Sequence, residues 1–221
     1  MAELLSPPSL QAATIDLPDG RSLAGLVARP SEFLATLVVL HETSQDLDQG
    51  AGLLGAMSDN ELRMLAIDRP GHGLSGDARD DADAEAMLRA ALDTISDTRQ
   101  RPLVIVAIGN ASPLAWGLTS HPAVIGLALI SPYIGGPLPR LSPDLSLIAF
   151  VPQNDLRSVE DWGKLRRMAG CRWLGVTMAV DPIAMLDPNG FALSQIAAHL
   201  AGFTREITMH HAVAMPIAEA E

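Results

Sequence analysis

Cysteine is almost missing from this sequence, since Cys171 is the only one in 221 residues. One thiol excludes an internal disulfide and a zinc site built from several thiolates. It also agrees with a reducing compartment, so we expect a cytoplasmic protein. Aromatic residues are scarce too, at 4% of the chain. The core must therefore be filled by aliphatic side chains and methionine.

Basic residues are outnumbered, with 15 Lys and Arg against 26 Asp and Glu and a net charge of −11. Nucleic acids and anionic membrane surfaces both select clustered basic side chains, so we exclude them as partners. No apolar run approaches the roughly 20 residues of a spanning helix. The segment Met1–Leu10 has neither a basic start nor a continuous apolar stretch, so no signal peptide is predicted.

Short apolar runs alternate with longer amphipathic stretches, which is typical of strands alternating with helices. An N-terminal hairpin is predicted because Pro18-Asp19-Gly20 supplies turn residues between two alternating segments, Ala13–Leu17 and Ser22–Ala28. Six further runs are nearly continuous in apolar residues, as strands covered on both faces should be. These predicted strands are Ala35–Leu40, Met64–Asp68, Leu103–Ile108, Ile125–Ser131, Leu145–Val151 and Trp173–Val180.

The clearest helix is predicted over Asp81–Arg99, where Leu88, Leu92 and Ile95 recur at helical spacing. The other predicted helices are Gln49–Asn60, Pro113–Thr119, Ser158–Ala169 and Pro188–Leu200. The fold class is therefore α/β: one domain over residues 1–221, with a mostly parallel twisted sheet, helices on both faces and an antiparallel hairpin at the start. Its framework spans about residues 13–201. In the tail, 202–221, the segment Arg205–Ala214 is predicted as an extra edge strand.

Three motifs follow predicted strands in a fixed order. They are Leu37-Val38-Val39-Leu40-His41, then Asp68-Arg69-Pro70-Gly71-His72-Gly73-Leu74-Ser75, then Ala107-Ile108-Gly109-Asn110-Ala111-Ser112-Pro113. Together they resemble the α/β-hydrolase superfamily, and the likeness runs from about Ala13 to Ala201. The resemblance implies a serine-hydrolase fold with a nucleophile on a sharp strand-to-helix turn.

The expected nucleophile is absent in this comparison, because the resemblance places Ala111 at the serine position. Gly109 takes the first small position beside the turn and Pro113 the second. Ser112 is an alternative nucleophile, but Asn110 and Leu114 would then flank it and are large for a tight turn. The other interpretation of Ser112 is a helix N-terminal serine with a local hydrogen bond.

The other two members of the triad are altered or unpaired. Matching the last strand to the family puts Asp181 where the histidine belongs, and an aspartate cannot relay a proton as an imidazole does. Asp155 matches the family's acid. It is either the remaining acid or a loop residue in an Asx-type turn.

The resemblance also implies an oxyanion hole formed by the backbone N–H groups of Thr43 and Ser112. Glu42 lies at its rim, where its carboxylate would oppose an oxyanion unless it points to solvent. His41 and Asn110 complete the cleft candidates. Only the loop Tyr133–Asp144 separates two strands between which relatives insert a cap, so a cap-less protein is predicted.

The remaining histidines are expected to be structural or exposed. His72 belongs to a turn, His121 is expected to be exposed in a loop, and His199 is expected at the surface or an interface. The pair His210-His211 could bind a metal, but on a strand adjacent side chains point to opposite faces. We predict no metal site and no cofactor.

Three functions are compatible with these residues. The first is a binding or scaffolding module without catalysis, taking an unknown small molecule or protein as its ligand. The second is an enzyme with rebuilt carboxylate or metal-assisted chemistry, for which Asp155, Asp181 and Glu42 would gather at the carboxyl ends of the strands. The third is a carboxylic-ester hydrolase using Ser112. A homodimer through an edge strand is compatible with all three.

Overall fold

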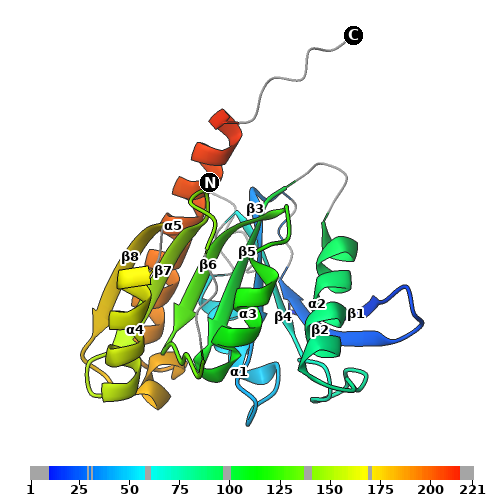
Figure 1. Cartoon of the computed structure of the whole chain (residues 1–221), viewed down its shortest axis with the longest axis horizontal. Coiled ribbons are helices and arrows are strands. Elements are labelled where there is room, and N and C mark those ends of the chain that lie inside the picture. Colours follow the sequence, from blue (N-terminus) through cyan, green and yellow to red (C-terminus); the bar gives the residue numbers. More distant parts are fainter. Residues whose placement is uncertain are drawn as a thin grey trace, which may run out of the picture.

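The protein is represented by a computed structural model, which describes residues 10–28, 30, 32–57, 61–96, 101–136, 141–168 and 171–214. Its architecture is one twisted sheet between two layers of helices (Figure 1). The eight strands are β1 (Gln11–Asp16), β2 (Ser22–Ala28), β3 (Ala35–Leu40), β4 (Leu62–Ile67), β5 (Leu103–Ile108), β6 (Val124–Ile130), β7 (Ser146–Pro152) and β8 (Arg172–Met178).

The strand order is β1-β2-β4-β3-β5-β6-β7-β8. β1 pairs with β2 and β2 with β4 in antiparallel fashion, and every later pairing is parallel. Every residue of β3, β5, β6 and β7 is buried, as expected for strands covered on both faces. Because these strands run in the same direction, their carboxyl ends all lie on one side of the sheet, where open α/β sheets place their functional residues.

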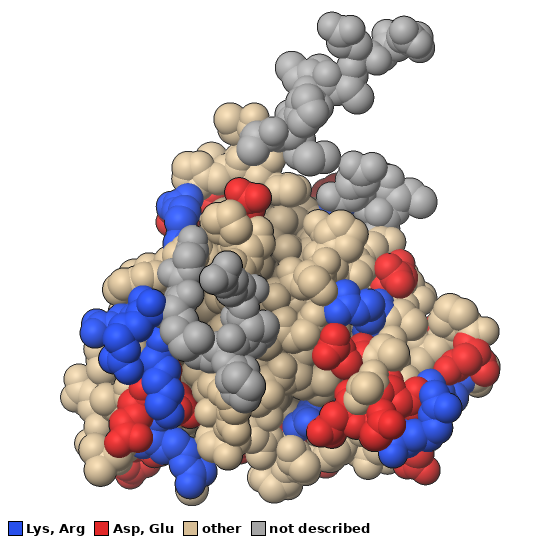
Figure 2. Space-filling model, in the orientation of Figure 1, with Lys and Arg blue, Asp and Glu red and all other residues tan. Residues whose placement is uncertain are grey.

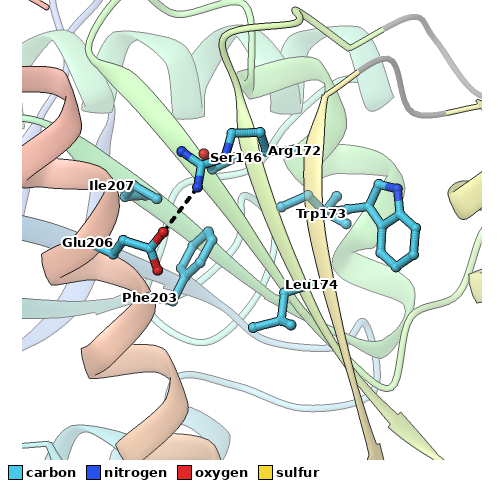
Figure 3. A pocket seen from close by; sticks show the side chains of 8 residues that line it. Ser146, Arg172, Trp173, Leu174, Phe203, Glu206 and Ile207 are labelled. Carbon is cyan, nitrogen blue, oxygen red and sulfur yellow. Dashed lines mark hydrogen bonds and ion pairs between the residues drawn. The ribbon is translucent and has the colours of Figure 1, made fainter.

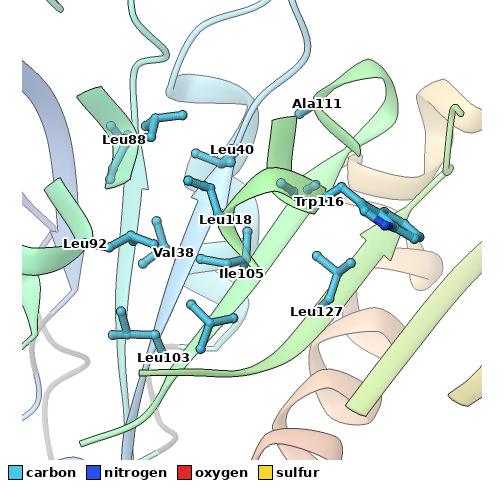
Figure 4. Packing of buried hydrophobic residues seen from close by; sticks show 14 of the residues in the cluster. Val38, Leu40, Leu88, Leu92, Leu103, Ile105, Ala111, Trp116, Leu118 and Leu127 are labelled. Carbon is cyan, nitrogen blue, oxygen red and sulfur yellow. The ribbon is translucent and has the colours of Figure 1, made fainter. Parts of the chain in front are cut away.

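Five α-helices cover the two faces: α1 (Asp48–Ala56), α2 (Asp81–Ile95), α3 (Ser112–Leu118), α4 (Leu156–Met168) and α5 (Phe191–Ala214). In Figure 1, α2, α3 and α4 lie in front of the sheet and α1 and α5 behind it. Each layer of helices covers one buried apolar cluster. Leu88, Leu92 and Trp116 pack with Val38 and Ile105 on the first face (Figure 4), and α1 and α5 enclose the second.

The predicted fold class is confirmed, including the N-terminal hairpin, and most strand bounds agree within two residues. The predicted helix ends Asn60, Arg99 and Ala169 lie outside the described residues, as do 215–221 of the tail. The prediction of an edge strand at Arg205–Ala214 is wrong, because this segment continues α5. Leu200, Phe203 and Ile207 are buried at helical spacing against the sheet, which favours helix over strand.

Two further structural observations bear on function. Between β6 and β7 the described part of the connection, 131–136 and 141–145, contains no helix, in agreement with a cap-less protein. Of the helices formed by the described residues, none has both the length and the apolar character needed to span a membrane.

Candidate functional site

A sharp turn follows β5 at the carboxyl ends of the parallel strands. The backbone leaves the strand at Gly109 with φ of +53°, the left-handed region that favours glycine. A short 3₁₀ turn, Gly109–Ala111, then leads directly into α3. The chain therefore bends from strand to helix at Gly109.

Ala111, which the resemblance matched to the nucleophile, lies two residues after Gly109. Ala111 has φ of −74° and ψ of −12°, an ordinary helical conformation, and its methyl group is buried in the cluster beneath α3 (Figure 4). Ala107 and Ala111 now flank Gly109 at the two positions where a tight turn needs small side chains. The motif is thus centred on a residue without a side chain.

The space beside Gly109 is filled by the Glu42 carboxylate. A Cβ atom added to Gly109 would overlap the Glu42 carboxylate group. Gln49 in α1 holds Glu42 in place, since the Gln49 side-chain nitrogen donates to Glu42 Oε2 at 3.3 Å and the Glu42 backbone N–H donates to Gln49 Oε1 at 2.8 Å. Glu42 is half-buried and points toward the bend, not freely into solvent.

The Thr43 backbone N–H, which was expected to serve an oxyanion hole, donates to the Asn110 side-chain oxygen at 2.8 Å. The Thr43 hydroxyl donates to the same oxygen at 3.0 Å, and Arg69 Nη1 donates to that hydroxyl at 2.9 Å. One of the two backbone N–H groups predicted to form the oxyanion hole is therefore already hydrogen-bonded within the protein. The Asn110 side chain thus joins the loop after β3 to the bend after β5 by hydrogen bonds.

His41 is a core residue with an almost fully buried ring. Its Nε2 accepts from the Arg69 backbone N–H at 2.9 Å, and its Nδ1 lies 2.7 Å from the Glu42 carbonyl oxygen. The ring must then carry its proton on Nδ1. Burial lowers the pKa of His41, which favours the neutral form of its ring. His41 fastens the start of the Glu42 loop to the motif that begins with Asp68.

Ser112, the alternative nucleophile, is completely buried at the start of α3. Its hydroxyl donates to the Gly109 carbonyl oxygen at 2.7 Å, three residues earlier, and accepts from the Tyr133 backbone N–H at 3.4 Å. This is the local hydrogen bond of a helix N-terminal serine.

The two aspartates that were matched to the triad have separate surroundings. Asp155 accepts from the backbone N–H groups of Arg157 and Ser158, at 3.2 and 3.3 Å, and from the Ser158 hydroxyl. This is helix capping at the start of α4. Asp181 is exposed, and its backbone carbonyl accepts from Ala184. Neither carboxylate is drawn into a shared cluster with Glu42.

The remaining histidines include one correction. His121 was expected to be exposed, yet it is buried, and its Nε2 lies 3.0 Å from Asp93 Oδ1. His72 bridges the carbonyl oxygens of Pro70 and Thr43, in keeping with a role in its turn. His199 and His210 are exposed on α5. In the part of the chain that is described, no three His, Cys, Asp or Glu residues come together as a metal site would require.

No protein-family model and no curated protein matches this sequence. Solved structures do match it. A CIB-like hydrolase from Thermoplasma acidophilum has a TM-score of 0.69 at 16% identity, over 90% of this chain and 99% of its own. The bottromycin epimerase BotH, solved with bottromycin A2, has a TM-score of 0.68 at 15% identity, over 87% and 99%. XC6422 from Xanthomonas campestris, described as an α/β serine hydrolase without a lid, has a TM-score of 0.61 at 14% identity, over 96% and 99%.

The chain has the α/β-hydrolase fold. At these identities the likeness shows the fold alone, and the chemistry must be argued from the residues. The bend after β5 holds Gly109. Sequence reasoning did not centre the turn on Gly109, although the small pair Ala107 and Ala111, spaced two residues either side of Gly109, was a signal that could have found it.

Proposed function

We propose that this protein is a non-hydrolytic member of the α/β-hydrolase fold that acts as a binding or scaffolding module. The observation that carries the proposal is the pairing of Gly109 with Glu42 at the bend after β5. Gly109 offers no hydroxyl, and the Glu42 carboxylate fills the space that a nucleophile would need. A carboxylate at that point also disfavours the negative charge of an acyl-transfer intermediate.

The rest of the site supports the same proposal. The Thr43 N–H is bonded to Asn110, and Ser112 is bonded to the Gly109 carbonyl. Asp155 caps α4, and the exposed Asp181 stands where the resemblance expected a histidine. Each polar group that hydrolysis would use therefore has a structural partner or lies away from the bend. BotH is described as an epimerase, so a similar fold is compatible with functions other than hydrolysis.

Reaction with a fluorophosphonate probe and with short-chain chromogenic esters tests the proposal. We expect neither covalent labelling nor ester turnover above the buffer rate, while an active serine hydrolase treated in parallel is labelled fully. The Ser112→Ala variant is the matched control and should behave like the parent chain. Stoichiometric labelling of the parent chain would overturn the proposal, and its loss in Ser112→Ala would identify Ser112 as the nucleophile.

A second candidate function is favoured by Glu42 itself. Its carboxylate is half-buried, is oriented by Gln49 and lies at the edge where α/β sheets bind ligands. It could serve as a general base in a rebuilt, carboxylate-based enzyme. The metal-assisted version is tested by thermal unfolding with Mg²⁺ and Ca²⁺. This version predicts that either ion raises the unfolding midpoint of the parent chain and leaves the midpoint of Glu42→Gln unchanged. No shift in the parent chain would count against it.

A further inference from the structure

The last strand, β8, forms one open edge of the sheet. It pairs with β7 over Arg172–Met178, and no other described strand lies on its outer side. Its outward backbone N–H and C=O groups are available to a further strand. Six of its seven residues are at least partly exposed, whereas every residue of β7 is buried. The edge is therefore accessible along nearly its whole length.

Apolar side chains are exposed on both faces of this edge. Trp173 is 46% exposed and stacks edge-on against Trp162 of α4, with ring centroids 5.5 Å apart. Leu174 is 49% exposed and lies on the α5 side, beside a groove of about 220 Å³ that Phe203 and Ile207 also line. Figure 3 shows Trp173 and Leu174 on opposite sides of the strand.

The two edges of the sheet differ in composition. At the β1 edge, Gln11, Thr14 and Asp16 are exposed polar residues. β8 has no lysine, no proline and no acidic residue, and its one charged residue, Arg172, stands at the start. Natural edge strands that must stay free usually carry charges or proline. The β8 edge lacks these devices.

The ends of β8 carry opposite charges. Arg166 and Arg167 at the end of α4 supply the positive charge near the start of the strand, where Arg172 is ion-paired with Glu206 of α5 at 3.0 Å. Figure 2 shows basic side chains gathered over this region. Beyond the end of β8, Asp181 and Asp187 are exposed. A second β8 that ran antiparallel would bring the basic end of one strand beside the acidic end of the other.

We propose that β8 is the interface of a homodimer, in which two copies pair antiparallel about Gly175 and continue the sheet across the molecular boundary. Gly175 is the midpoint of the seven-residue strand. Pairing about it sets Leu174 opposite Val176 of the second copy on the α5 face and Trp173 opposite Thr177 on the α4 face. Such a contact is closed and two-fold, so it produces dimers and not filaments.

Sedimentation analysis over a wide range of concentration tests the interface. We expect the parent chain to sediment as a dimer and Leu174→Lys to weaken dimerisation by at least about tenfold. Thr14→Lys, the matched change on the β1 edge, should leave the dimer intact. A parent chain that stays monomeric at every concentration, or a dimer lost equally in both variants, would overturn the proposal.

A charge exchange tests the orientation of the pairing. Arg167→Glu and Asp181→Arg should each weaken the dimer, and the double variant should recover it, because the attractive contacts are then restored with their signs swapped. Hydrogen exchange of the parent chain should slow across 172–178 as concentration rises. Failure of the double variant to recover, or slowing confined to another segment, would contradict antiparallel pairing at β8.

Discussion

At the scale of single residues, Gly109 decides how the site is built. Its left-handed backbone favours glycine, and the Glu42 carboxylate occupies the space beside it, so a side chain there would have to displace Glu42. A residue with a Cβ at this position would destabilise the folded state through backbone strain and through its contact with Glu42. The pair Gly109 and Glu42 therefore forms one unit, and changes at the two positions should not be additive.

The first prediction concerns this pair. Gly109→Ala should lower the free energy of unfolding by about 1–2 kcal/mol, because the new methyl group adopts a strained backbone conformation and displaces the Glu42 carboxylate. Adding Glu42→Ala removes the overlap, so the double variant should be more stable than Gly109→Ala and retain a deficit of about 1 kcal/mol from backbone strain. Urea unfolding measures both. Additive losses would show that the two positions do not touch.

The second prediction concerns His41. Burial holds its folded-state pKa below that of an unfolded chain, so its contribution to stability is present above about pH 6.5 and is lost as the pH falls below that value. Ring-nitrogen NMR through a pH titration should show that neutral His41 carries its proton on Nδ1 and that the ring becomes charged only at a lower pH than an ordinary histidine. A His41 ring that charges at or above the ordinary histidine range, or whose neutral form is protonated on Nε2, would contradict its place between Arg69 and Glu42.

At the scale of elements, α5 shows why a short pattern can mislead. The segment Arg205–Ala214 contains Ile207 and Thr208, β-branched residues that favour a strand when the segment is considered alone. In the fold, Phe203 and Ile207 complete the apolar stripe that begins at Ala192, and the helix runs on to Ala214. Burial of that stripe against the sheet outweighs local propensity.

The third prediction concerns Thr204 in this helix. Thr204 is fully buried, and its hydroxyl has no hydrogen-bond partner among the described residues. Thr204→Val keeps the shape and removes the unpaired hydroxyl, so it should raise the free energy of unfolding by about 1 kcal/mol. Thr204→Ser keeps the hydroxyl and loses a methyl group, so it should lower that free energy by about 1 kcal/mol. A destabilised Thr204→Val would reveal a partner for the hydroxyl.

At the scale of the whole molecule, the two apolar clusters share the strands between them. Neighbouring residues of one strand point into opposite clusters, as Leu147 and Ile148 of β7 do. Loss of packing on one face therefore disturbs strands that the other face also needs, and we expect the protein to unfold as one unit.

The fourth prediction follows from this arrangement. Phe150→Ala in the centre of β7 should cost about 3–5 kcal/mol and shift the whole unfolding transition, because the ring is fully buried. Phe191→Ala is the matched control. Its ring is 77% exposed at the start of α5, so its effect should stay within about 0.5 kcal/mol. Circular dichroism and tryptophan fluorescence should report one coincident transition, and separate transitions would contradict a single unit.

The sequence by itself determined the fold class, the hairpin and the order of strands and helices. Apolar periodicity and turn residues depend on residues that are close in the sequence, so they can be recognised without a structure. The resemblance also predicted, from the sequence, that the serine-centred motif after β5 is incomplete. It did not determine which residue sits at the bend, because a two-residue shift leaves the apolar pattern of β5 unchanged.

Only the tertiary structure decided how the functional residues meet. The approach of Glu42 to Gly109, the bond from Thr43 to Asn110 and the burial of His121 against Asp93 each join segments from different parts of the chain. The same holds for α5 and for the open edge at β8, whose state depends on what packs beside them. Contacts between distant segments are set by how whole elements pack, and local sequence carries no record of that packing.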